Sequence, residues 1–150
     1  MRVYEARIQY NLVSLGEDVV LDTPAKVTEY VKDLYEANPV QEQFVVIMVD
    51  RKNHPIARQV VTTGTLTGSL VGARETFRAA ILANAASIIA SHNHPSGSPE
   101  PSQADCQVTR QLRQAGDVLG IQLVDHVIVG TQEGDPAGRG WYSFREAGLV

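Results

Sequence analysis

The spacing of hydrophobic positions divides the first 40 residues into a strand-like and a helix-like segment. Near the N-terminus, apolar side chains recur at close to the two-residue period of a strand, at Val3, Ala6, Ile8, Tyr10 and Leu12. Thr23 then offers a helix N-cap with Pro24 at the first helical position, and Asn38-Pro39 offers a helix end. The pattern therefore predicts a strand and one helix within residues 1–39.

The middle of the chain predicts a hairpin, a helix and a short strand. QEQFVVIMVD (41–50) is a nearly continuous apolar strand, and a turn at 51–54 leads into a second strand, IARQVVTT (56–63). A helix is expected over about 74–86, with one apolar face formed by Phe77, Ala80, Ile81 and Ala85. SIIAS (87–91) follows as a short buried strand.

The C-terminal third predicts another helix and a further strand. The helix covers about 103–115, with Gly116 at its C′ position and an inward face formed by Ala104, Val108, Leu112 and Ala115. IQLVDHVIVG (121–130) is the strand, GDPAGRG (134–140) is a loop, and WYSFREAGLV closes the chain. Because helices alternate with strands but the middle contains a hairpin, we expect an α/β fold with a mixed sheet flanked by helices.

Composition narrows the class of protein. A length of 150 residues is about one domain, and 43% hydrophobic with 20% charged residues excludes a disordered tail. One cysteine, Cys106, excludes an internal disulfide and cysteine-built zinc modules, so the cytoplasm is the expected location. No signal core or membrane-length apolar run is present, so no membrane partner is expected. The net charge of −4 disfavours a broad nucleic-acid footprint.

The candidate chemistry lies between residues 91 and 105. His92 and His94 leave the short buried strand two residues apart, so extended backbone would point both imidazoles the same way. A proline-rich loop over 95–101 then leads to Ser102 and to Asp105 at a helix start. Two histidines and one aspartate suit Zn²⁺ and leave its fourth position open, as in catalytic sites.

Each of these residues also has a purely structural interpretation. Ser102 and Asp105 fit a capping box, and a single histidine at a strand end is usually a surface or hydrogen-bonded residue. The joint pattern favours a metal site, and a cap can also fix a ligand in place.

A water molecule on such a metal needs a carboxylate as base. Glu42, Glu75 and Glu100 are candidates, and spacing alone favours Glu42 only slightly over Glu75.

The spacing His-x-His-x7-Ser-x2-Asp resembles the JAMM (JAB/MPN) metalloenzyme motif. The fuller text SHNHPSGSPEPSQAD, with LGIQLVDHVIVG and YSFREAGLV, resembles the RadC family over about residues 40–150. The resemblance implies a three-layer α-β-α fold of the cytidine-deaminase-like JAMM/MPN type. It also implies His92, His94 and Asp105 as zinc ligands, Glu42 as the base that activates water, and Ser102 as the group that supports the oxyanion.

Two features depart from the family pattern. Asn93 stands between the histidines, where many eukaryotic JAMM enzymes have Ser or Thr and RadC-like chains usually have Asn. Full-length RadC proteins also carry an N-terminal helix-hairpin-helix region, for which residues 1–39 are too short. We therefore expect one domain over 1–150, a strand-helix extension (1–39) on a core (40–150), of bacterial or phage/plasmid-type origin.

The leading functional hypothesis is a zinc-dependent hydrolase that cleaves an amide bond, peptide or isopeptide, in a peptide or protein substrate. The alternatives are a DNA-processing or DNA-binding protein associated with repair, and a non-catalytic metal-binding scaffold. A deaminase is disfavoured because its cysteine signature is missing. Strand edges and the N-terminal segment could pair, so a homodimer is a further option.

Four more residues carry smaller predictions. His126 is expected to pack in the sheet or to hydrogen-bond a ligand histidine, with Asp125 a weaker candidate for that bond. Cys106 is predicted as a small buried residue, and His54 as an exposed turn residue.

Overall fold

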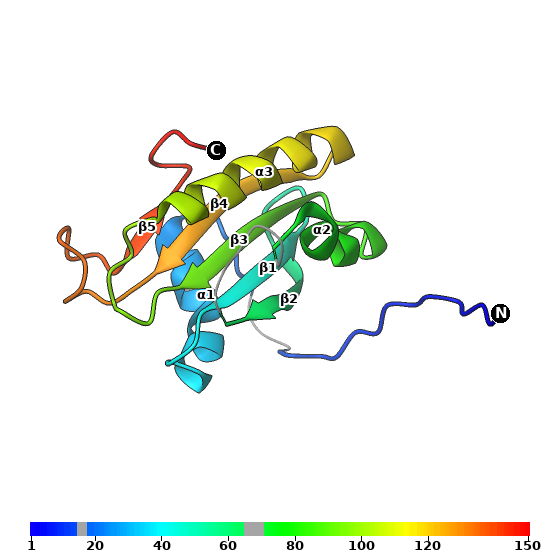
Figure 1. Ribbon diagram of the computed structural model, residues 1–150, viewed down its shortest axis with the longest axis horizontal. Coiled ribbons are helices and arrows are strands. Elements are labelled where there is room, and N and C mark those ends of the chain that lie inside the picture. Colours follow the sequence, from blue (N-terminus) through cyan, green and yellow to red (C-terminus); the bar gives the residue numbers. More distant parts are fainter. Residues whose placement is uncertain (15–17, 65–70) are drawn as a thin grey trace.

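A computed structural model describes residues 1–14, 18–64 and 71–150 (Figure 1). Three helices and five strands are present in these ranges. The helices are α1 (Pro24–Ala37), α2 (Ala73–Leu82) and α3 (Gln103–Leu119). The strands are β1 (Gln43–Val49), β2 (Pro55–Thr63), β3 (Ser87–Asn93), β4 (Gln122–Val129) and β5 (Trp141–Ser143).

The five strands form one mixed sheet in the order β2-β1-β3-β4-β5. β1 runs antiparallel to both β2 and β3, β3 and β4 are parallel, and β5 returns antiparallel to β4. The parallel pair needs a crossover connection, which α3 supplies. The predicted α/β class with a mixed sheet is confirmed.

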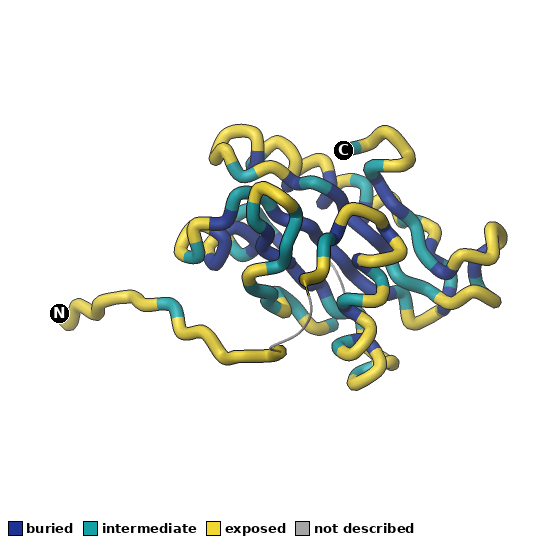
Figure 2. Tube along the Cα trace, turned by 180° about the vertical axis from the view of Figure 1, so that it is seen from behind, coloured by how far each residue is buried: buried dark blue, intermediate teal, exposed yellow. Residues whose placement is uncertain are grey.

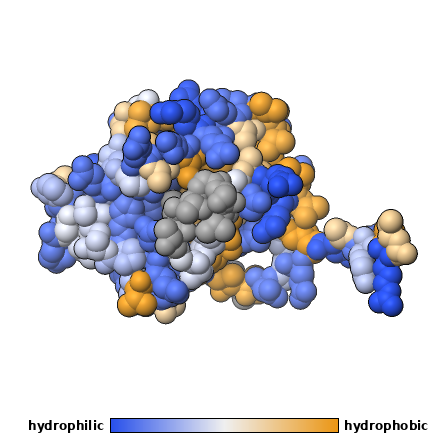
Figure 3. All heavy atoms as spheres, in the orientation of Figure 1, coloured by the Kyte–Doolittle hydropathy of each residue, from blue (hydrophilic) through white to orange (hydrophobic). Residues whose placement is uncertain are grey.

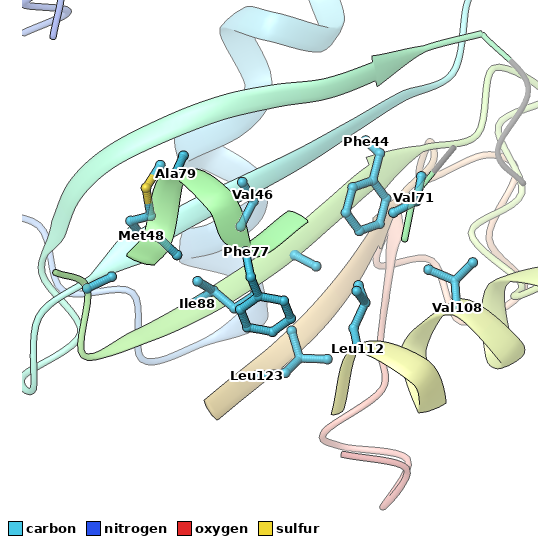
Figure 4. Packing of buried hydrophobic residues seen from close by; sticks show 13 residues of the cluster. Phe44, Val46, Met48, Val71, Phe77, Ala79, Ile88, Val108, Leu112 and Leu123 are labelled. Carbon is cyan, nitrogen blue, oxygen red and sulfur yellow. The ribbon is translucent and has the colours of Figure 1, made fainter. Parts of the chain in front are cut away.

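Helices cover both faces of the sheet, which explains why β1 is apolar at almost every position. Phe44, Val46 and Met48 point into a cluster with residues of α2 and α3 (Figure 4). The alternate residues of β1 pack with α1 in a second cluster. The three-layer arrangement implied by the family resemblance is therefore present, with α2 and α3 on one face and α1 on the other.

The helix ends differ from two predictions. α3 continues past Gly116 to Leu119 and ends at Gly120, which has a φ of 72°. Gly116 lies inside the helix, at a position where a Cβ would collide with the carbonyl oxygen of Ile121. α2 ends at Leu82 rather than near 86, since the chain turns at Asn84 with a φ of 54°.

Two residues predicted on inward faces are exposed. Ile81 of α2 has 53% of its surface accessible, and Ala104 lies on the outer side of the first turn of α3.

The face drawn in Figure 3 is mainly hydrophilic, with apolar residues in separate patches. None of the helices in the described ranges is long and apolar enough to cross a membrane.

The strand predicted near the N-terminus is wrong. Residues 1–14 form no strand, and most of them are exposed along a segment that extends away from the body (Figure 2). Ile8 packs partly against the core, and residues 7–14 line a hollow opposite β2 without joining the sheet. Alternation of apolar residues is insufficient here, because a strand also needs a hydrogen-bonded neighbour.

Candidate metal centre

The histidine pair lies where β3 leaves the sheet, facing the first turn of α3. His92 is fully buried near the end of β3, and its register partner on β1 is Phe44. Glu42 directly precedes β1, so the antiparallel pairing brings it to the same end of the sheet. Asp105 occupies the first turn of α3 and is 3% exposed. Four of the predicted site residues thus come from three separate elements.

The two histidines and Asp105 form a tight set of potential ligands. The Nε2 atoms of His92 and His94 are 3.0 Å apart. Asp105 places Oδ1 3.2 Å from Nε2 of His92 and Oδ2 3.2 Å from Nε2 of His94. Zinc bonds of about 2.0–2.1 Å in a tetrahedron separate neighbouring ligand atoms by about 3.3 Å. The spacing and the N/O donor types therefore fit a zinc ion.

Glu42 reaches the same cluster from the other side. Its Oε1 lies 3.9 Å from Nε2 of His94, and one ligand atom each of Glu42, His92 and His94 lie within 4.8 Å of one another. Glu75 instead opens α2, and Glu100 is exposed in the loop before α3. A hollow of about 330 Å³ adjoins Glu42 and is lined by Val40, Gln41, Glu42, Gly64 and Pro95.

Asn93 holds the backbone on both sides of Glu42. The Gln43 amide donates to Oδ1 of Asn93 over 2.8 Å, and Nδ2 of Asn93 donates to the Gln41 carbonyl over 3.0 Å. The position of Asn93 in a strand gives the signal, because alternate side chains point to opposite faces and Asn93 cannot point with the histidines. From the sequence alone, Asn93 stood out only as a departure from the eukaryotic pattern, and its hydrogen bonds around Glu42 were not predicted.

Ser102 and Asp105 form the predicted capping box. Ser102 Oγ accepts a hydrogen bond from the Asp105 amide over 3.1 Å, and the Ser102 amide donates to Asp105 Oδ2 over 2.8 Å. The cap and the candidate ligand position are therefore one arrangement, since the same carboxylate oxygen also faces His94.

The loop between the ligands is packed against the loop that follows β4. Nδ1 of His94 donates to the Ser98 carbonyl over 2.8 Å, so Nε2 of a neutral His94 carries the lone pair. The Gly97 carbonyl accepts from the Thr131 amide, and a Cβ at Gly130 or Gly134 would collide with that carbonyl. These two glycines, which were not singled out from the sequence, permit the loop after β4 to approach the Gly97 carbonyl closely. This contact holds the neighbouring Ser98 carbonyl, the acceptor of the His94 hydrogen bond, in place.

His126 is hydrogen-bonded to His92, as one of its two predicted roles requires. His126 Nε2 lies 2.7 Å from His92 Nδ1, and its own Nδ1 lies 2.6 Å from Thr109 Oγ1. Asp125 does not take this role, because its carboxylate accepts from the His126 amide and the Ser143 hydroxyl.

The two smaller predictions are also inexact. Cys106 is half-buried rather than buried, and His54 is half-buried with its ring against Asp50.

Burial and hydrogen bonds at the site shift the pKa values of Asp105, His94 and His126 in different directions. Burial raises the pKa of Asp105, but hydrogen bonds from His92 and His94 outweigh it and hold the pKa far below its usual range. Burial lowers the pKa of His94, while the bond to Asp105 and the Ser98 carbonyl raise it above its ordinary value. Burial, reinforced by His92, lowers the pKa of His126 well below normal, which keeps that imidazole neutral.

A mixed sheet that carries a His-x-His pair beside an acid at a helix start defines an α/β domain of the JAB type. The model of the RadC-like JAB domain family matches residues 21–149. The chain belongs to this family.

Among its relatives is a UPF0758 protein of Rubrobacter xylanophilus, 41% identical over 87% of this chain and 54% of the relative. UPF0758 proteins of Chlorobaculum tepidum and Thermotoga maritima are 45% and 44% identical over 83% and 85% of this chain, which correspond to 52% and 54% of those proteins. The chain thus spans about half the length of the curated relatives it matches.

Proposed function

We propose that this chain is a zinc-dependent hydrolase that cleaves an amide bond, peptide or isopeptide, in a peptide or protein substrate. The observation that carries the proposal is the convergence of two imidazole nitrogens and the Asp105 carboxylate at 3.0–3.2 Å, with Glu42 Oε1 3.9 Å from the His94 nitrogen. His92, His94 and Asp105 would hold the metal. The net charge of −4 disfavours nucleic acid as the substrate.

Zn²⁺, when bound, lowers the pKa of a water molecule and polarises a carbonyl oxygen. Glu42 would accept a proton at Oε1 and later deliver it to the leaving nitrogen, the work of a general base and then a general acid. Its side chain is 29% exposed and adjoins the 330 Å³ hollow, so a substrate segment lying there would reach it. Asn93 supports this role because it fixes the backbone on either side of Glu42.

Ser102 would support the developing negative charge on the substrate carbonyl. Its oxygen accepts the Asp105 amide, so its hydroxyl proton is left to donate to an oxyanion. The same cap holds Asp105, which places both the donor and the candidate ligand at the start of α3.

The test compares metal content and hydrolysis in wild type, Asp105→Ala, Glu42→Gln and Glu100→Gln. Zinc is titrated into each protein, and cleavage of unfolded polypeptide and isopeptide-linked peptides is followed by mass spectrometry. Asp105→Ala is expected to lose stoichiometric zinc. Glu42→Gln is expected to keep zinc and to lose about 10²–10⁴-fold in rate, the usual contribution of a general base. Glu100→Gln, in the exposed loop, is the control that keeps both.

Two outcomes would overturn the assignment. Absence of stoichiometric zinc in the wild type would remove the metal from the proposal. Equal zinc loss in Glu42→Gln and Asp105→Ala would make Glu42 a ligand rather than the base.

A further inference from the structure

The two histidines of the metal centre are held by different kinds of partner. The Ser98 carbonyl that faces His94 can only accept a hydrogen bond, so it fixes the proton of His94 on Nδ1. His92 instead faces Nε2 of His126 at 2.7 Å, and an imidazole nitrogen can either donate or accept. The direction of this bond therefore determines whether His92 Nε2 is available to a metal ion.

Thr109 removes the ambiguity. Its hydroxyl has one proton, which it donates to the carbonyl of Asp105 one turn earlier in α3, over 2.8 Å. At 2.6 Å from His126 Nδ1, the same oxygen must then accept, so Nδ1 carries the proton of His126. Nε2 of the neutral His126 accepts from Nδ1 of His92, which leaves the lone pair of His92 on Nε2.

The surroundings of His126 keep this ring in place. His126 is 0% exposed and stacks on Phe144 with ring centroids 4.9 Å apart and planes 10° apart. Phe44 also packs edge-on against this ring, with centroids 5.5 Å apart. A fully buried ring packed against two aromatic side chains cannot exchange its hydrogen bonds with water.

The hydrogen bonds that begin at His92 also reach the second buried candidate ligand, Asp105. It runs from His92 on β3 to His126 on β4 and Thr109 on α3, and ends on the backbone carbonyl of Asp105. β3 and α3, the two elements that carry the buried ligands, are thereby tied together behind the site.

We propose that His126 and Thr109 are positioning residues of the metal centre, which fix His92 as the Nδ1-protonated tautomer and set its distance from Asp105. The inference rests on the proposed function, because it concerns the same metal. Partners of metal-bound histidines that act in this way typically contribute 10–100-fold in affinity.

The test uses three single variants of the full chain. Thr109→Val keeps the shape of the side chain but removes the acceptor for His126, so the His126 proton is better placed on Nε2, facing His92. Thr109→Ser keeps the hydroxyl. Thr28→Val is the matched control, because Thr28 makes the same bond to a carbonyl four residues earlier, 2.9 Å to Pro24, but has no hydrogen bond to a histidine among the described residues.

Zinc affinity is measured by competition with a chelator, and the tautomer of His126 by ¹⁵N NMR of the metal-free protein. Thr109→Val should bind zinc about 10–100-fold more weakly, while Thr109→Ser and Thr28→Val stay near wild type. The spectrum of the wild type should show His126 protonated on Nδ1. This state is the same whether a proton or a metal ion occupies His92 Nε2.

Unchanged zinc affinity in Thr109→Val, or a wild-type His126 protonated on Nε2, would overturn the inference. The NMR result stands apart from the proposed function. A wild type that binds no zinc would refute the proposed hydrolase function. The tautomer of His126 in the metal-free protein would still test the hydrogen bonds from Thr109 through His126 to His92. Thermal melts of all three variants distinguish a variant that has lost its fold from one that is folded but binds zinc more weakly.

Discussion

The two sides of the candidate metal centre are built in opposite ways. On the β3–α3 side, the side chains of His92 and Asp105 are 0% and 4% exposed, and each is held by further buried groups. On the β1 side, Glu42 is 29% exposed and is positioned through its neighbours in the backbone. His94, at 13%, stands between them. The buried side has the properties of a ligand set, and the open side those of a group that meets substrate.

The difference follows from what each role requires. A ligand must keep one distance and one tautomer, which packing and buried hydrogen bonds enforce. A base must exchange protons and meet a substrate, so it needs an accessible side chain on a fixed backbone.

Asn93→Ala should disturb the open side and spare the ligand side. It removes two hydrogen bonds around Glu42, each worth about 1 kcal/mol of unfolding free energy. Urea unfolding should show that loss, and hydrogen exchange at the Gln43 amide should become faster, while zinc affinity stays unchanged. Asn93→Asp keeps the acceptor for Gln43 and should show slower exchange there than Asn93→Ala. A parallel loss of zinc in Asn93→Ala would mean that the two sides are not separable.

Ser102→Ala and Thr23→Ala compare two N-caps, of which only one adjoins the candidate metal centre. Ser102 caps α3 and Thr23 caps α1. Both variants should lose about 0.5–2 kcal/mol of unfolding free energy. Only Ser102→Ala should also weaken zinc binding, because the Asp105 amide loses its acceptor at Ser102 Oγ, although the Ser102 amide can still donate to the Asp105 carboxylate. Calorimetric titration with zinc checks this, and equal affinities in the two variants would show that the cap does not position the ligand.

The smallest effect is expected from acid on the metal-free protein. Because the folded-state pKa of Asp105 is depressed far below its unfolded value, its contribution to stability is full above about pH 3.9 and is lost progressively as pH falls toward the folded-state pKa. The difference in unfolding free energy between wild type and Asp105→Asn, measured with chelator, should therefore be smaller at pH 3 than at pH 7. Asp117→Asn, on the exposed end of α3, should leave the acid dependence of the wild type unchanged. If the difference in unfolding free energy between wild type and Asp105→Asn were the same at both pH values, the partners of Asp105 would not lower its pKa in the folded protein.

Much of this architecture could be predicted from short-range patterns. The apolar run QEQFVVIMVD (41–50) predicted a strand, which the structure has as β1, and Thr23-Pro24 predicted a capped helix start. The spacing of His92, His94, Ser102 and Asp105 identified the candidate site because all four lie within 14 residues. Two predictions from local pattern were wrong. Residues 1–14 alternate in hydrophobicity but have no strand partner, and Gly116 permits close packing inside α3 rather than ending it.

The sequence by itself determined the elements of the core, the candidate ligands and the family. Only the tertiary structure decided which groups stand behind those ligands. Thr109 and His126 are 17 residues apart, and Asn93 meets the backbone 50 residues earlier, so their partners depend on how α3 and β1 pack against β3. Periodicity determines which face a side chain occupies within its own element. The direction of a hydrogen bond between two histidines is set by a third group from another element, which the folded chain alone brings into contact.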